Sequence, residues 1–143
     1  MTENNRIRIT HPAKWKLGVS SILFEDLTVK DLKDCHEAGI ECIEASLPLS
    51  NVEDINEEIN RYESIFSQAD QYGIEIWSVH LPYGIAWDVS YLNAKIRYKI
   101  VSKFEKVLEM TARLRPKKAV IHASFEPVFK IRRKARLAAS RQA

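Results

Sequence analysis

The sequence predicts an α/β fold in which about four strand–helix units build one parallel sheet. Short apolar segments rich in β-branched residues alternate with longer segments whose apolar residues recur every three or four positions. Glycine or proline interrupts the chain between many of these segments, which separates each predicted strand from the helix after it. This alternation is typical of βα units around a parallel sheet.

The first unit consists of a strand over 16–20 (KLGVS) and a helix over about 28–38. Asp26 or Thr28 is the expected N-cap, because an oxygen on such a side chain accepts hydrogen bonds from the unpaired N–H groups of the first turn. Gly39 follows the helix as its C-terminal stop, since glycine adopts the left-handed conformation that ends many helices.

The second unit consists of a strand over 40–46 (IECIEAS) and a helix over about 54–72. Pro48 breaks the chain between the two, and Gly73 ends the helix. The apolar residues of this helix recur at three- and four-residue spacing: Ile55, Ile59, Tyr62, Ile65, Phe66 and Ala69. The acidic residues lie on the other side, so the helix is expected to pack one face against the sheet.

The third unit consists of a strand over 74–80 (IEIWSVH) and a long helix over about 91–114. Six residues of this helix lie along one stripe, five of them apolar: Ile96, Ile100, Phe104, Val107, Leu108 and Thr111. Pro116 closes the unit, because proline cannot continue a helix without losing a hydrogen bond.

The fourth unit begins with a strand over 118–122 (KAVIH). Beyond Glu126-Pro127, further residues have the spacing of an opening helix: Ile131, Ala135, Leu137 and Ala138. The sequence then ends without a helix stop signal, so we expect this last helix to be incomplete.

Composition indicates one ordinary globular domain, with 143 residues of which 45% are hydrophobic and 29% charged. No apolar segment approaches the roughly 18 residues that span a bilayer, and the first twelve residues lack the apolar centre of a secretory signal. We therefore expect a cytoplasmic protein. Cys35 and Cys42 are too few for a disulfide framework and are expected to be reduced, packed thiols.

The net charge of +3 depends on the C-terminal tail. Residues 130–143 contain six basic side chains and no acidic one, which leaves 16 basic against 19 acidic groups in the rest of the chain. A nucleic-acid-binding protein is expected to carry a positive patch on its folded surface. The mildly acidic body therefore makes nucleic acid an improbable partner.

Polar residues stand at the ends of three neighbouring predicted strands. Side chains alternate between the two faces of a strand, and this alternation defines three sets on one face: Ile40, Cys42 and Glu44; Ile76, Ser78 and His80; and Val120 and His122. The opposite sets are Ile43 and Ala45, Trp77 and Val79, and Ala119 and Ile121. If these bulkier sets face the helices, Glu44, His80 and His122 all point to the opposite, inner side of the sheet. They then converge near the C-terminal ends of the strands, where βα barrels have their catalytic residues. Imidazole and carboxylate groups bind divalent metals or sugar hydroxyls.

The strings KLGVS, GIECIEAS, YGIEIWSVHLPYG with WDVS after it, and KKAVIHASFEP resemble the first four strand regions of the xylose isomerase-like superfamily. This superfamily includes sugar phosphate isomerases and epimerases and the apurinic endonucleases of the endonuclease IV type. The resemblance covers roughly residues 14–140. It implies that Glu44, His80 and His122 bind the substrate and that the two histidines bind a divalent metal.

The resemblance also implies a (β/α)₈ TIM barrel, of which the chain is the N-terminal half. We expect residues 1–143 to form a single domain that is incomplete at its C-terminus, because a full barrel usually needs about 250 residues. Relatives take their metal ligands and acid/base carboxylates from strands five to eight, so the catalytic residues are unknown. The chain also departs from its relatives at Leu114-Arg115-Pro116, where they usually carry glycine.

The resulting hypothesis is a sugar or sugar-phosphate isomerase or epimerase that uses metal-assisted proton transfer next to a carbonyl and is inactive as this chain alone. Mn²⁺, Mg²⁺ or Zn²⁺ would serve the intact protein, with weak or no binding by this chain. One alternative is an abasic-site endonuclease, which the acidic loops after the strands disfavour. Another is a non-catalytic half-barrel that pairs as a homodimer, because an open parallel sheet exposes its edges. Truncation of a longer protein also remains open.

Overall fold

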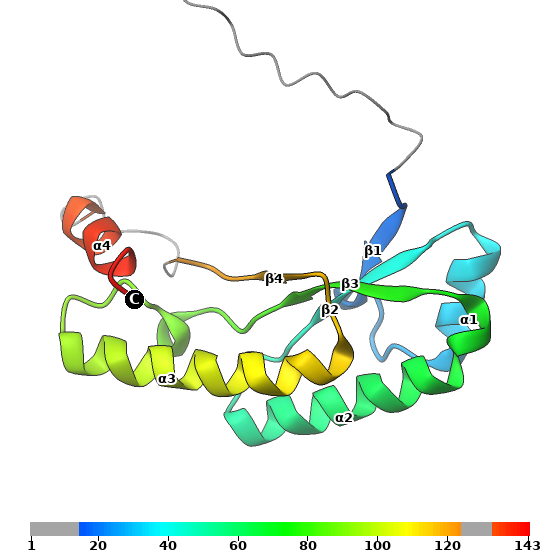
Figure 1. Cartoon of the computed structure of the whole chain (residues 1–143), viewed down its shortest axis with the longest axis horizontal. Coiled ribbons are helices and arrows are strands. Elements are labelled where there is room, and N and C mark those ends of the chain that lie inside the picture. Colours follow the sequence, from blue (N-terminus) through cyan, green and yellow to red (C-terminus); the bar gives the residue numbers. More distant parts are fainter. Residues whose placement is uncertain (1–14, 124–132) are drawn as a thin grey trace, which may run out of the picture.

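The computed structural model describes residues 15–123 and 133–143, in which four strands form one parallel sheet in the order β1-β2-β3-β4. The strands are β1 (Gly18–Ser20), β2 (Cys42–Ser46), β3 (Glu75–His80) and β4 (Lys118–Val120). The helices are α1 (Val29–Glu37), α2 (Val52–Gln68), α3 (Ala94–Thr111) and α4 (Arg133–Ser140). Figure 1 shows α2 and α3 lying side by side along one face of the sheet. The predicted fold class, parallel βα units in sequence order, is confirmed.

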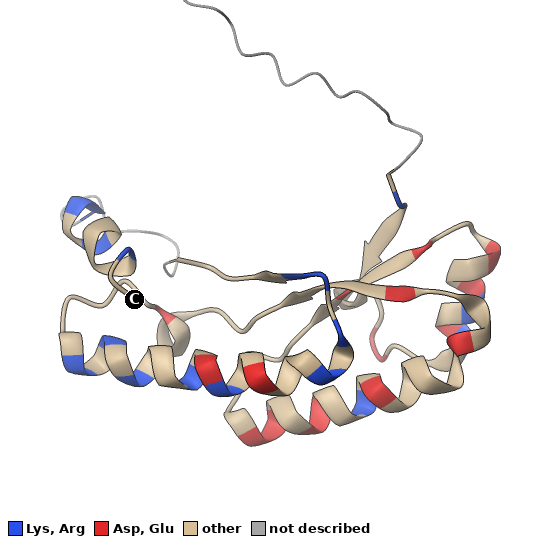
Figure 2. Cartoon of the chain, viewed as in Figure 1, with Lys and Arg blue, Asp and Glu red and all other residues tan. Residues whose placement is uncertain are grey.

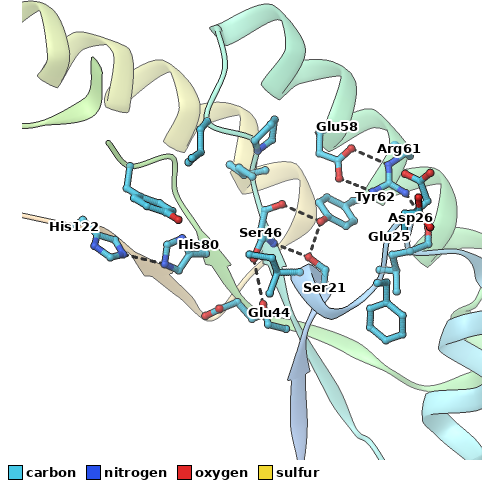
Figure 3. A pocket seen from close by; sticks show the side chains of 18 residues that line it. Ser21, Glu25, Asp26, Glu44, Ser46, Glu58, Arg61, Tyr62, His80 and His122 are labelled. Carbon is cyan, nitrogen blue, oxygen red and sulfur yellow. Dashed lines mark hydrogen bonds and ion pairs between the residues drawn. The ribbon is translucent and has the colours of Figure 1, made fainter. Parts of the chain in front are cut away.

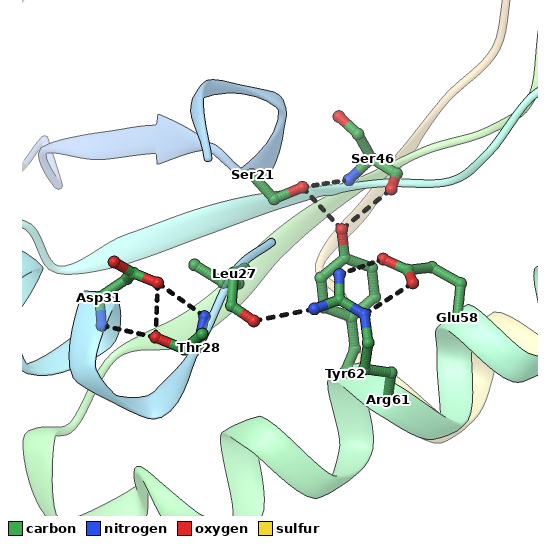
Figure 4. Close-up of polar contacts among 8 residues, drawn as sticks. All are labelled: Ser21, Leu27, Thr28, Asp31, Ser46, Glu58, Arg61 and Tyr62. Carbon is green, nitrogen blue, oxygen red and sulfur yellow. Dashed lines mark hydrogen bonds and ion pairs between the residues drawn. The ribbon is translucent and has the colours of Figure 1, made fainter. Parts of the chain in front are cut away.

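Thr28, rather than Asp26, caps α1. Its hydroxyl oxygen accepts a hydrogen bond from the backbone N–H of Asp31 at 3.3 Å, and the Asp31 carboxylate accepts one from the Thr28 N–H at 2.8 Å (Figure 4). This reciprocal pair is a capping box, which satisfies two N–H groups that would otherwise lack partners. Gly39 follows the helix with φ of 80°, a conformation that glycine adopts without strain.

Asparagine side chains set the starts of the two longer helices. Asn51 caps α2, which therefore begins earlier than the sequence predicts, and its Oδ1 accepts from the Asp54 N–H at 2.9 Å. Asn93 caps α3, which begins later than predicted. A short 3₁₀ turn follows the C-terminal end of each helix, at Asp70–Tyr72 after α2 and at Ala112–Leu114 after α3.

The core lies between the sheet and the helix layer. α2 contributes Ile55, Ile59, Tyr62 and Ile65, and α3 contributes Ile100, Phe104, Val107 and Thr111. Two residues of the predicted α3 stripe are not buried, since Ile96 and Leu108 are 41% and 42% exposed. At about 100° per residue they lie roughly 60° to either side of the buried stripe, which places them at its margins.

The predicted alternation along β3 is wrong at one point. Ile43 pairs with Ile76, but the next residue of β2, Glu44, pairs with Ser78, so that Trp77 is an extra residue. Ile76 consequently joins the buried core, whereas Trp77 is 41% exposed and lines a groove on the opposite face. Such a one-residue irregularity reverses the faces of all residues before it relative to those after it.

The last unit is shorter than predicted, because β4 ends at Val120 and His122 lies just beyond it. The helix predicted after Glu126-Pro127 is present as α4 from Arg133, while Glu126, Pro127 and Ile131 lie outside the described residues. In Figure 2, α4 has blue segments, which mark Lys and Arg, and no red ones, which mark Asp and Glu. Within residues 15–123 and 133–143, no helix has the length and apolar character needed to cross a membrane.

Both cysteines are buried and free, as expected for packed thiols. Burial raises the pKa of the Cys35 and Cys42 thiols, which keeps them in the less reactive protonated form.

Candidate functional site

One cleft of about 780 Å³ at the carboxyl ends of the strands includes Glu44, His80 and His122 in its lining (Figure 3). The strand register explains why these residues meet. Ser46 pairs with His80 across β2 and β3, and His80 pairs with Val120 across β3 and β4. Glu44 lies two residues before Ser46 on β2, and a two-residue step along a strand returns to the same face. His122 lies two residues after Val120, just beyond the end of β4.

The two histidine rings are in direct contact, with 3.1 Å between Nε2 of His80 and Nε2 of His122. Nδ1 of His80 lies 3.2 Å from the carbonyl oxygen of Leu81. A carbonyl oxygen only accepts hydrogen bonds, so this contact requires the proton of a neutral His80 on Nδ1. The lone pair of His80 is then on Nε2, where it accepts from the Nε2–H of His122.

Tyr83 completes an aromatic group around the histidines. Its ring stacks on His122 with centroids 4.8 Å apart and planes inclined by 24°, and it meets the edge of His80 at 5.7 Å. Sequence reasoning missed this residue, although it belongs to the HLPYG string that directly follows β3. The three rings form a wall on one side of the cleft.

Glu44 is held by a neighbour on the next strand. The hydroxyl of Ser78, a buried residue, donates a hydrogen bond to Oε2 of Glu44 at 3.1 Å. This contact fixes one carboxylate oxygen and leaves the other without a described partner. A fixed carboxylate with a free oxygen can accept a hydrogen bond from a ligand hydroxyl.

A closed ring of hydrogen bonds lies at the end of the cleft near β1 (Figure 4). The hydroxyl of Tyr62 lies 3.0 Å from the Ser46 carbonyl, to which it donates, and 2.7 Å from the hydroxyl of Ser21. The Ser46 N–H in turn donates to Ser21 Oγ at 2.9 Å. These bonds join α2 to the ends of β1 and β2. Burial raises the pKa of Tyr62 to about 12, so its hydroxyl keeps the proton that it donates in this ring of hydrogen bonds.

The described charges of the cleft are mostly negative. The lining contains the carboxylates of Glu25, Asp26, Glu44 and Glu58. Its one guanidinium, on Arg61, is already occupied: Nε and Nη2 donate to Glu58 at 2.8 and 2.6 Å, and Nη1 donates to the Leu27 carbonyl at 2.8 Å. Arg61 therefore supports the wall of the cleft and has little capacity left for a ligand.

Metal-binding groups are present only in part. Among residues 15–123 and 133–143, no three His, Cys, Asp or Glu side chains are arranged to hold a metal ion together. His80 and His122 provide two nitrogen ligands, whereas structural zinc sites have four protein ligands and catalytic sites generally three.

No protein-family model and no curated protein matches the sequence. The structure, in contrast, resembles D-psicose 3-epimerase, solved in the presence of D-fructose, with a TM-score of 0.67 and 17% sequence identity over 90% of this chain. It also resembles a xylose isomerase domain protein from Planctomyces limnophilus, with a TM-score of 0.51 and 12% identity over 92% of this chain.

This chain spans 45% of the length of the epimerase and 52% of that of the xylose isomerase domain protein. The described fold is thus part of a TIM barrel, close to one half. The resemblance stated from the sequence is confirmed for the fold.

Proposed function

We propose that this chain carries part of the active site of a sugar or sugar-phosphate isomerase or epimerase. The observation that supports this proposal is the convergence of Glu44, His80 and His122 on one cleft at the carboxyl ends of adjacent parallel strands, where barrel enzymes hold their substrates. The general class also agrees with the epimerase and xylose isomerase domain protein that share the fold.

The residues of this chain would bind and orient the substrate. The free oxygen of Glu44 accepts a hydrogen bond from a sugar hydroxyl, while Ser78 keeps the carboxylate in place. His122 would donate through Nε2–H, either to His80, whose Nε2 lies 3.1 Å away, or to a substrate oxygen that replaces it. The base that removes a proton next to the carbonyl is unknown. We expect it outside this chain, together with the rest of a single barrel domain.

The geometry of the histidine pair suits a divalent metal. Two nitrogen ligands each about 2.1 Å from one ion, at angles of about 90–110°, lie roughly 3.0–3.4 Å apart. The observed separation of the two Nε2 atoms is 3.1 Å. Mn²⁺, Mg²⁺ or Zn²⁺ bound there would polarise the substrate carbonyl. His80 has its proton on Nδ1, so the lone pair on its Nε2 could bind a metal in place of the His122 N–H. His122 would bind through Nε2 with its own proton on Nδ1 instead.

The endonuclease alternative is less well supported, because it requires a surface that attracts the phosphates of DNA. The described lining of the cleft has four carboxylates, and its Arg61 is bound to Glu58.

A cytoplasmic location stays a prediction.

A second candidate role is that of a half-barrel that pairs with another copy of itself. It is favoured by two aromatic side chains on the open face of the sheet, Trp15 at 70% and Trp77 at 41% exposure. β1 and β4 are also edge strands, each with one described neighbour. Two copies related by a two-fold axis could join β1 of one to β4 of the other.

Titration of the ¹⁵N-labelled chain with D-fructose, followed by NMR, tests the proposed function. We expect amide shifts around Glu44, His80 and His122, with Mg²⁺ enhancing them, and loss of these shifts in Glu44→Gln. Glu37→Gln, on the exposed end of α1, serves as the matched control. Shifts confined to other regions, or shifts unchanged by Glu44→Gln, would overturn the assignment. We expect no aldose–ketose turnover by the chain alone.

A further inference from the structure

A buried ionic cluster outside the cleft joins α4 to the loop that follows β3. Asp88 and Ser90 are only 3% and 1% exposed, and Arg136 reaches them from α4. Arg136 Nη2 forms an ion pair with Asp88 Oδ2, and Arg136 Nε donates to Ser90 Oγ at 2.9 Å. The proposed function uses none of these three residues.

The hydrogen bonds of this cluster account for each oxygen of the buried carboxylate. Oδ1 of Asp88 accepts from the Ser90 N–H at 2.8 Å and from the Ser90 hydroxyl at 2.5 Å, while Oδ2 is bound to Arg136. A buried carboxylate is costly unless it is paired. Removal of Arg136 would leave Asp88 without a counter-ion, so the placement of α4 and the structure of this loop depend on one another.

The cluster connects the loop after β3, the strand that ends at His80, with α4, the helix that comes after His122 in the sequence. Asp88 follows His80 by eight residues, and Arg136 follows His122 by fourteen. The connection on the β3 side is tightly packed: Leu81 donates its N–H to the Val120 carbonyl at 2.9 Å, and buried Trp87 packs on Phe104 with centroids 5.1 Å apart.

Tyr83 lies inside this connection. It is 38% exposed between buried Leu81 and buried Trp87, and its ring stacks on His122. The chain is therefore anchored on both sides of the residue that contacts the histidines. A change at Asp88 would move or loosen the loop where it carries Tyr83.

We propose that Arg136 is a positioning residue, which acts through Asp88 and Ser90 to hold Tyr83 against His122 and so to maintain the contact between His122 and His80. This inference rests on the proposed function only for its consequence, the binding of a metal or sugar at the histidine pair. The mechanical link itself is independent of that function and can be measured without a ligand.

Three variants of the full chain test the link. Arg136→Gln removes the ion pair, Arg136→Lys keeps a positive charge at Asp88, and Ser90→Ala removes one hydroxyl while leaving the charges. Arg133→Gln and Arg141→Gln are matched controls, because both residues are exposed near or on the same helix. NMR of the Tyr83, His80 and His122 rings reports the aromatic contacts, and Co²⁺ absorption reports metal affinity.

We expect Arg136→Gln to shift the ring signals of Tyr83 and His122 and to weaken Co²⁺ binding by about tenfold or more, as loss of outer ligand support does elsewhere. Arg136→Lys should restore most of both signals, and the controls should match the wild type. If Arg136→Gln does not fold, Ser90→Ala must produce the ring shifts on a smaller scale.

The proposal is overturned if Arg136→Gln or Ser90→Ala lowers thermal stability while the ring signals of Tyr83 and His122 stay unchanged. Absence of Co²⁺ and sugar binding in the wild type would instead count against the proposed function. Ring shifts in the variants would support the positioning role even in that case, so the two failures are distinguishable.

Discussion

Nε2 of His80 and Nε2 of His122 lie 3.1 Å apart although 42 residues separate them in the sequence. The parallel pairing of β3 with β4 brings them together, and Tyr83 packs against both rings. Each ring nitrogen that faces the other is also the atom that would bind a metal.

Replacing either histidine should therefore remove metal binding. We expect the chain to bind Zn²⁺ or Mn²⁺ weakly, because two imidazoles supply part of a coordination sphere. Isothermal titration of His80→Ala and His122→Ala should detect no binding at this site. His36→Ala, at an exposed position of α1, is the control and should behave as the wild type. Metal binding that persists in His80→Ala and His122→Ala would place the metal elsewhere.

Tyr62→Phe should destabilise the fold more than its small chemical change suggests. Tyr62 is only 2% exposed, and its hydroxyl forms hydrogen bonds with Ser46 and Ser21. Removal of this hydroxyl therefore leaves the Ser46 carbonyl unpaired. We expect a loss of about 1–3 kcal/mol in the free energy of unfolding. Tyr98→Phe, at an exposed position on α3, should change it by less than about 0.5 kcal/mol. Urea denaturation compares the two, and equal effects would contradict the buried ring of hydrogen bonds.

The same tyrosine should make stability depend on pH in alkaline solution. Burial raises the pKa of Tyr62 from 10.0 to about 12 in the folded chain. Between these values the unfolded chain has released a proton that the folded chain retains, so stability falls as pH rises. The contribution is fully present below about pH 10. The stability difference between the wild type and Tyr62→Phe should thus shrink from pH 10 to 12. A constant difference would contradict the raised pKa.

Much of the fold could be predicted because its signals are local. The apolar spacing of α2 and α3 follows from the helix period, and Thr28 is a cap that the residues themselves indicate. Glu44, His80 and His122 could be grouped because polar residues at the ends of parallel strands meet at one rim. Their placement in one cleft agrees with that grouping, while their roles stay a prediction.

The rest depends on contacts between distant parts of the chain. The extra residue at Trp77 arises from how β3 pairs with β2, and a single strand carries no sign of it. The Ser78 bond to Glu44 and the Arg136 pair with Asp88 span 34 and 48 residues. In the sequence, Arg136 is one of several basic residues in the tail, and only the folded chain distinguishes it from Arg133 or Arg141.

Self-association can be tested by mass. If the open face pairs with a second copy, light scattering should give a dimer, and Trp15→Ser with Trp77→Ser should convert it to a monomer. Both indoles are exposed on or beside that face, so their removal takes away apolar surface that a partner would bury. Tyr98→Ser is the control on the outer side of α3. A wild-type monomer, or a dimer that survives the tryptophan changes, would contradict this role.

The most direct test of the proposed site is a crystal structure of the chain with Mn²⁺ and D-fructose. We predict an anomalous peak for Mn²⁺ within ligand distance of Nε2 of both His80 and His122. We also predict sugar density in the same cleft, with a hydroxyl bound to Glu44. Manganese and sugar density that both avoid these three residues would contradict the account.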